Sequence, residues 1–243
     1  MRIVLIIQAR MGSSRLPGKV MLDLCGKTVL EHVIDRCRAI SLVDHLVVAT
    51  TVNTEDDRIE QCCLRQGISC YRGDEYDVLA RYYKAAKKYR ADIVVRVTSD
   101  CPLIDPGLAE EVICMFLEQP EVEYCSNDLI ETFPRGLNVE VFSFRALEYA
   151  YEHAVNAYER EHVTPYIYEH PERFRVATLT SNVDYSRHRW TLDTKKDWIL
   201  ISEIYRLLYQ GDIMPWKEVI DLVERYPELP LINADVVQKK LGE

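Results

Sequence analysis

A cationic segment that contains two glycines, residues 8–19, carries the clearest chemistry in this sequence. It reads QARMGSSRLPGK, and its three cations are Arg10, Arg15 and Lys19. It follows the continuous apolar run at 3–7, which is typical of a strand buried on both faces of a parallel sheet. Residues 1–22 contain no acidic side chain, although the formal net charge of the chain is -9. Because ligands of open α/β sheets bind at the carboxyl ends of the strands, the segment is predicted to bind the phosphates of an anionic ligand.

The spacing of the segment excludes two common phosphate-binding loops. The nucleotide-hydrolase loop requires Gly-x4-Gly-Lys followed by Ser or Thr, whereas here five residues separate Gly12 from Gly18 and Val20 follows the lysine. The dinucleotide fingerprint Gly-x-Gly-x-x-Gly is also absent from the sequence. Taken alone, the segment is equally well interpreted as a solvated basic loop with a glycine turn.

The segment resembles the signature of the sugar-activating cytidylyltransferases, specifically the spore coat polysaccharide biosynthesis protein F (SpsF-like) branch. CMP-sialic acid and CMP-3-deoxy-octulosonate synthetases are more distant relatives with a similar loop. The resemblance continues in order through VATT (48–51), RGDEYDVLARY (72–82), SDCPLIDP (99–106), GLNVEVF (136–142), REHVTPY (160–166) and WTLDT (190–194). It implies a Rossmann-like three-layer α/β nucleotidyltransferase fold with a mostly parallel sheet. It also implies a magnesium-dependent enzyme that makes a CMP-sugar from CTP, with release of pyrophosphate, for surface or spore coat polysaccharide.

Two aspartates are the candidate metal ligands. Asp100 follows the apolar run at 93–97, so its carboxylate is expected at the same sheet edge as the cationic segment. Mg²⁺ takes one or two carboxylates together with substrate phosphate oxygens. The resemblance assigns this role to Asp100 and Asp193. For Asp193 helix capping is the alternative, because Asp or Thr ahead of Lys-Lys-Asp is an ordinary N-terminal signal.

The resemblance also supplies the residues that would bind the nucleotide. Lys19 and Arg15 would bind the β- and γ-phosphates, and Arg10 would lie nearer the α-phosphate, so these three and Asp100 are the candidate catalytic residues. Backbone groups of Ala9, Met11 and Gly12 would contact the base and ribose. The nucleotide-binding set is completed by Ser13, Asp77, Arg81 and Ser99. A surface ion pair would explain the spacing of Asp77 and Arg81 equally well, because residues four apart share a helix face.

Three residues are candidates for binding the sugar, namely Asn138, Glu140 and His162. A lone histidine is often structural, but the setting REHVTP supports a functional reading. The sequence departs from the pattern of its relatives at Ser99, Arg135 and Asn138, which leaves the identity of the sugar open. The tyrosines at 149, 151, 158, 166 and 168 are assigned to core or dimer packing.

Composition limits the class of protein. A sequence pI near 5.3 argues against a nucleic-acid partner. No run reaches the length of a membrane span, and the first apolar run is too short for a signal peptide, so a cytoplasmic protein is expected. The eight cysteines are predicted to be reduced and mostly buried, with Cys101 as the exception at the site. One domain is expected over 1–243, with a less regular part for sugar binding and homodimer formation at about 125–180.

The hydrophobic pattern predicts βαβ winding and therefore a mostly parallel sheet covered by helices. Strands are predicted at 3–7, 45–50, 68–71, 93–97, 139–144 and 174–179. Helices are predicted at 29–40, 56–65, 77–89, 107–117, 196–209 and 216–226, with a helical region at 146–169 and an amphipathic end at 234–241.

A similar fold could serve two other functions, glycosyl transfer or a non-catalytic scaffold. A GT-A-like glycosyltransferase of similar architecture would use a finished nucleotide-sugar, but the sequence has no Asp-x-Asp metal motif, and Arg15 with Lys19 suits a triphosphate better. A non-catalytic scaffold could keep the same fold. The joint presence of the three cations and both aspartates argues against that alternative.

Overall fold

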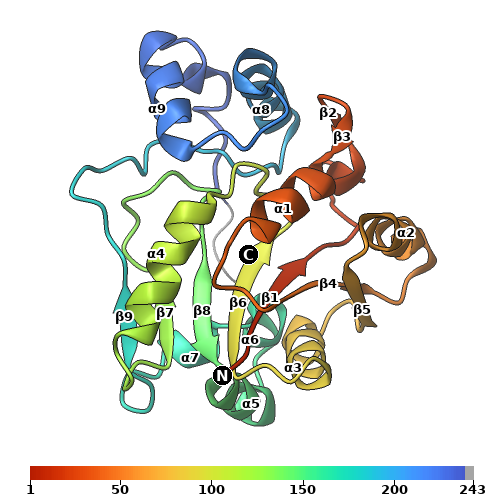
Figure 1. The fold of residues 1–243 in the computed structure, drawn as a ribbon, viewed down its shortest axis with the longest axis vertical. Coiled ribbons are helices and arrows are strands. Elements are labelled where there is room, and N and C mark those ends of the chain that lie inside the picture. The colour runs from red at the N-terminus through yellow and green to blue at the C-terminus, as the bar shows by residue number, and fades with distance from the viewer. Residues whose placement is uncertain (239–243) are drawn as a thin grey trace.

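The computed structural model describes residues 1–238 and contains a central seven-stranded mixed sheet (Figure 1). In sheet order the strands are β5 (Ser69–Gly73), β4 (His45–Thr51), β1 (Ile3–Gln8), β6 (Ile93–Thr98), β8 (Glu140–Ser143), β7 (Tyr124–Ser126) and β9 (Val176–Thr178). Strand β8 is antiparallel to both of its neighbours, whereas the other pairings are parallel. Because β6 and β7 are both antiparallel to β8, they run in the same direction, and their carboxyl ends lie at the same edge of the sheet.

Helices cover both faces of the sheet. The first face packs against α1 (Val29–Arg38), α2 (Asp57–Gln66) and α4 (Pro106–Leu117). The second packs against α3 (Val78–Lys88), α5 (Phe144–His153), α6 (Ala157–His162) and α7 (Pro165–Tyr168). The alternation of β1 explains both layers, because Leu5 and Ile7 belong to the first core and Val4 and Ile6 to the second. The three-layer α/β architecture predicted from the sequence is confirmed.

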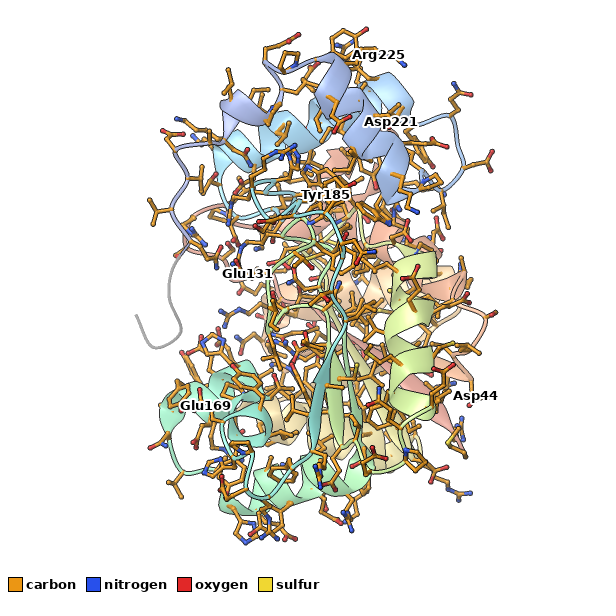
Figure 2. All side chains as sticks on the ribbon, turned by 90° about the vertical axis from the view of Figure 1, so that its left-hand side faces the viewer. Asp44, Glu131, Glu169, Tyr185, Asp221 and Arg225 are labelled. Atoms are coloured by element: carbon orange, nitrogen blue, oxygen red, sulfur yellow. The ribbon has the colours of Figure 1, made fainter. Side chains whose placement is uncertain are left out.

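A third core lies beyond one end of the sheet, where α8 (Lys195–Leu208) and α9 (Trp216–Arg225) pack together. Figure 2 shows Tyr185 beside this pair, with Asp221 and Arg225 on α9, and Glu169, just after α7, near the opposite end of the molecule. The small elements are β2 (Asp23–Leu24), β3 (Lys27–Thr28) and the 3-10 turns η1 (Lys19–Met21), η2 (Thr54–Asp56) and η3 (Pro230–Ile232).

Several details differ from the sequence predictions. The strands β2, β3 and β7 were not predicted, and the strand predicted at 174–179 is only three residues long. The helical region at 146–169 consists of three short helices. Of the amphipathic end predicted at 234–241, residues 234–235 form a turn, 236–238 have no regular secondary structure, and 239–241 lie outside the described residues. Within the described chain no helix is both long and apolar enough to cross a membrane.

The cysteines are free thiols, as predicted, but their burial differs in detail. Cys101 has only 4% of its surface exposed, so it is not an exception to burial, although it does line the cavity at the predicted site. The exposed cysteines are instead Cys25 and Cys114. Burial raises the pKa of the Cys101 thiol, and the neighbouring charge of Asp100 raises it further, so this thiol stays protonated at neutral pH.

Candidate functional site

The carboxyl ends of β1 and β6 lie side by side and bring the two halves of the predicted site together. Strand β1 leads into the cationic segment, and β6 leads into Ser99 and Asp100. The amide of Ser99 donates to the carbonyl of Gln8 at 2.9 Å, which extends the pairing beyond both strands. The amide of Leu192 donates to the carbonyl of Asp100 at 2.8 Å and brings the WTLDT segment to the same edge. Three segments that are far apart in the sequence therefore meet here.

A cavity of about 1160 Å³ opens at this edge. Most of the predicted site residues line it, namely Arg10, Gly12, Ser13, Arg15, Lys19, Ser99, Asp100, Asn138, Glu140, His162 and Asp193. Tyr158 also lines the cavity, although it was predicted to serve in core or dimer packing. Among the described residues that were predicted for the site, four do not line the cavity, namely Ala9, Met11, Asp77 and Arg81.

Lys19 lies between the two aspartates. Its Nζ is 2.7 Å from Oδ2 of Asp100 and 2.8 Å from Oδ1 of Asp193. Burial of the ammonium opposes its charge, but the charges of Asp100 and Asp193 outweigh this and raise the pKa of Lys19. Burial likewise opposes the charge of Asp100, whereas the charge and hydrogen bond of Lys19 lower its pKa to about 2. Both partners are therefore charged at neutral pH.

Asp193 is held by two further cations and does not cap a helix. Its Oδ2 lies 3.1 Å from Nη2 of Arg15 and accepts a bond of 2.8 Å from Nη2 of Arg189. The residue that caps α8 is Thr194, whose hydroxyl accepts from the amide of Asp197 in a capping box. The capping alternative for Asp193 is therefore wrong, and its carboxylate is directed at the cations of the cavity.

A buried network supports Arg189. Its Nε donates to Oδ1 of Asp197 at 3.0 Å, and Asp197 has no exposed surface. Nδ2 of Asn233 donates to the carbonyl of Arg189 at 2.9 Å and to Asp197 at 2.8 Å. Burial opposes the charge of Asp197, but hydrogen bonds from Asn233 and Arg189 lower its pKa. The orientation of Asp193 therefore depends on residues up to 40 positions further along the chain.

The other end of the cavity carries the predicted sugar-binding residues. Glu140 is 8% exposed and accepts hydrogen bonds from Arg96, from the hydroxyl of Tyr124 at 3.0 Å and from the hydroxyl of Thr164. Burial lowers the pKa of His162, so its imidazole is neutral at pH 7. The oxygens of Glu140 are thus occupied within the protein, whereas the neutral ring of His162 faces the cavity.

Asp128 lines this end as well, although it was not predicted as a site residue. It follows β7, whose carboxyl end lies at the same sheet edge as that of β6. Nδ2 of Asn138 donates to its carboxylate, and Oδ1 of Asn138 accepts from the amide of Gly136 at 2.8 Å. Burial raises the pKa of Asp128 to about 6, with a further contribution from the charge of Glu140. The available signal was an acidic residue two positions after the short segment VEYCS at 122–126.

The proposed backbone contacts of Ala9 and Met11 are restricted by existing hydrogen bonds. The Ala9 amide donates to the carbonyl of Ala49 at 3.1 Å, and the Met11 amide donates to Oδ1 of Asp56 at 2.7 Å. The Met11 carbonyl accepts from the amide of Gly18 at 3.1 Å. Any contact of Ala9 with a base or ribose must therefore use its carbonyl group.

Asp77 and Arg81 do not form the expected surface ion pair. Asp77 caps α3 through the amide of Ala80 at 3.0 Å and pairs with Arg160 at 2.6 Å. Arg81 is 1% exposed, and its Nη1 donates to the carbonyl of Asp74 at 2.6 Å. The ion-pair alternative is wrong, because Arg81 is buried and Asp77 has another partner. Their role in nucleotide binding stays a prediction.

Comparison with known proteins identifies the family of this chain. The cytidylyltransferase family model matches residues 4–219. The chain belongs to the cytidylyltransferase family. It is 33% identical to the spore coat polysaccharide biosynthesis protein SpsF of Bacillus subtilis (strain 168), over 93% of this chain and 95% of that protein. It is 40% identical to an uncharacterized protein of Methanocaldococcus jannaschii, over 100% of this chain and 99% of that protein.

A solved cytidylyltransferase has the same fold. The structure from Leptospira borgpetersenii serovar Hardjo-bovis (strain JB197) superimposes with a TM-score of 0.91 and is 34% identical, with 95% of this chain and 97% of that chain covered. The family, the fold and the prediction of an enzyme of this family are confirmed. The match also favours nucleotidyl transfer over the glycosyltransferase and scaffold alternatives.

The two aspartates have the chemistry of a divalent-cation site that is completed by substrate. Their carboxylate oxygens are the hard ligands that Mg²⁺ prefers. In the described part of the chain no group of three or more His, Cys, Asp or Glu residues could hold a metal ion. If Asp100 and Asp193 hold the ion, the remaining ligands would have to come from phosphate oxygens and water.

Proposed function

We propose that the protein is a magnesium-dependent cytidylyltransferase that transfers CMP from CTP to a sugar hydroxyl. The bond from the sugar oxygen to the α-phosphorus forms, the bond from the α-phosphorus to the bridging oxygen of the β-phosphate breaks, and pyrophosphate leaves. The hydroxyl proton passes to solvent. The observation that carries the proposal is the set of cations around Asp100 and Asp193, with Lys19 and Arg15 in the same cavity.

The cationic segment would bind and position the triphosphate. Lys19 and Arg15 would hold the β- and γ-phosphates and stabilise the negative charge that develops on the departing pyrophosphate. Arg10 would contact the α-phosphate. Asp100 and Asp193 would hold Mg²⁺, which when bound neutralises charge on the phosphate oxygens. The remaining nucleotide contacts are proposed for Ala9, Met11, Gly12, Ser13, Asp77, Arg81 and Ser99.

Asn138, Glu140 and His162 would line the sugar subsite. The departures at Arg135 and Asn138 concern this end of the cavity, so the nucleotide end is the better supported half of the proposal. The similarity to SpsF supports a role in surface or spore coat polysaccharide biosynthesis. A cytoplasmic homodimer is proposed as well, with the irregular part at about 125–180 as its interface.

Metal dependence tests the roles of the two aspartates. Chelation should abolish pyrophosphate release from CTP. Asp100→Asn and Asp193→Asn should each require much more magnesium for any residual rate, because each removes one of the two carboxylate ligands. Asp35→Asn is the matched control, since Asp35 pairs with Lys27 at 2.7 Å outside the cavity. An unchanged magnesium requirement in Asp193→Asn would remove Asp193 from the metal site.

A further inference from the structure

Lys19 occupies the position between the carboxylates that the proposed function gives to a metal ion. Its Nζ lies within 2.8 Å of an oxygen from each aspartate, and the three side chains are 11%, 24% and 15% exposed for Lys19, Asp100 and Asp193. A lysine ammonium is a compact charge on a flexible four-carbon stem. It can therefore neutralise a pair of carboxylates much as a small cation does.

The surrounding charges strengthen this arrangement. Arg15 and Arg189 also contact Asp193, so three cations surround two carboxylates. No third acidic ligand joins them among residues 1–238. A divalent ion that entered without a triphosphate would have to displace the ammonium of Lys19 and would stay close to a positive charge. A triphosphate changes this balance, because its oxygens offer Lys19 and Arg15 new anionic partners.

We propose that Lys19 is an internal substitute for the metal ion, which blocks the Asp100–Asp193 pair until a triphosphate draws its ammonium away. This inference rests on the proposed function, because it takes the two aspartates as the metal ligands. Lys19 then has two alternative sets of partners, the carboxylates in the free protein and the phosphates in the complex. Because the metal and the triphosphate both favour the second arrangement, their binding is coupled.

An unusual consequence is that loss of the lysine should improve metal binding. Lys19→Met leaves two partly buried carboxylates without their shared ammonium, and these should attract a divalent ion even when nucleotide is absent. Lys19→Arg keeps the charge and should keep the block. A lysine that acted only on the phosphates would leave metal binding in the free protein unchanged.

The test uses Mn²⁺ alone as the probe, with free Mn²⁺ followed by its electron paramagnetic resonance signal and no nucleotide present. Lys19→Met should bind one Mn²⁺ about tenfold or more tighter than the wild type, as expected when a positive charge next to a cation is removed. Lys19→Arg should behave as the wild type. So should Lys27→Met, which removes an ammonium from Asp35 outside the cavity. Equal affinities of Lys19→Met and the wild type would overturn the proposal.

A double variant locates the bound ion. Lys19→Met combined with Asp100→Asn should lose the gain in Mn²⁺ affinity, because one of the two proposed ligands is gone. Retention of the gain would place the ion elsewhere and overturn the proposal. The thermal midpoint of Lys19→Met should rise on addition of Mn²⁺, whereas that of the wild type should not.

A second comparison needs no substitution of the lysine and holds even if Lys19→Met fails to fold. In the absence of nucleotide, the wild type and Asp100→Asn should bind Mn²⁺ equally weakly, because the pair is already blocked. Tight binding by the wild type that Asp100→Asn abolishes would show an open pair and overturn the proposal. Pyrophosphate release is measured separately, so a protein that binds Mn²⁺ as expected but transfers no nucleotide would contradict the proposed function alone.

Discussion

Gly136→Ala should lower both the stability and the activity of the protein, because Gly136 lies against the backbone that leads to Asp193. An added Cβ would lie 2.6 Å from the carbonyl carbon of Trp190, 2.7 Å from the amide nitrogen of Thr191 and 2.8 Å from the carbonyl oxygen of Trp190. Backbone atoms cannot move aside as the end of a flexible side chain can. The amide of Trp190 also donates to the carbonyl of Arg135 at 2.7 Å, so a displacement of either segment is passed to the other.

The expected loss of unfolding free energy in Gly136→Ala has two parts, the cost of left-handed backbone and the cost of the collision. The φ of Gly136 is +106°, and a side chain in left-handed backbone costs about 1–2 kcal/mol. The collision adds about 1–3 kcal/mol, as overpacking does in a filled core. Gly211→Ala is the matched control, because its φ is +107° and nothing lies within 4 Å of an added Cβ. Gly211→Ala should therefore show only the cost of a side chain in left-handed backbone.

Urea unfolding of both variants measures the difference. Gly136→Ala should lower the free energy of unfolding by about 1–3 kcal/mol more than Gly211→Ala. It should also reduce the rate of pyrophosphate release, since the loop with Asn138 and the segment with Asp193 both line the cavity. If the two variants agree within about 0.5 kcal/mol, the close approach at Gly136 is refuted.

Three further predictions use activity, binding and unfolding measurements. Lys19→Ala, with its fold confirmed by circular dichroism, should lower kcat by orders of magnitude, because it removes charge stabilisation from the departing pyrophosphate. Arg15→Ala should mainly raise the dissociation constant of CTP. A kcat near that of the wild type, or an unchanged dissociation constant, would contradict the respective role. Glu140→Gln and His162→Ala should raise the KM of the sugar or lower kcat, while the affinity for CTP, measured by calorimetry, should stay unchanged. A parallel loss of CTP binding in the folded variants would show that these residues do not belong to the sugar subsite. Asp128→Asn should raise the free energy of unfolding by about 1–3 kcal/mol above pH 6. Folding raises the pKa of Asp128 to about 6, so its charged form is disfavoured; the gain should shrink between pH 6 and pH 4, and a gain independent of pH would contradict this origin.

The nucleotide end of the cavity was predictable because its signals are local. The continuous apolar run at 3–7 and the mainly apolar run at 93–97 indicate buried parallel strands, and parallel strands present their carboxyl ends together. The cationic segment and Asp100 therefore had to lie at one edge. Residue types and the parallel direction of the strands were sufficient for this part of the fold.

The sugar end could not be predicted in the same way. Strand β7 is three residues long, and only its pairing with β8 shows that it runs parallel to β6 and presents Asp128 at the site. The position of Asp193 depends on Arg189, Asp197 and Asn233, whose contacts are tertiary. Local spacing also allowed an ion pair between Asp77 and Arg81. Because α6 packs on α3, Asp77 forms its ion pair with Arg160 instead.

Product analysis tests cytidylyl transfer itself. The protein is incubated with magnesium, a panel of sugars and either CTP, UTP, GTP or ATP; pyrophosphate is measured and the product is identified by mass spectrometry. CTP should react preferentially and only when a suitable sugar is present, with one pyrophosphate released for each CMP-sugar formed and none after chelation. Equal release from all four nucleotides, or consumption of CTP without a CMP-linked sugar, would contradict the assignment.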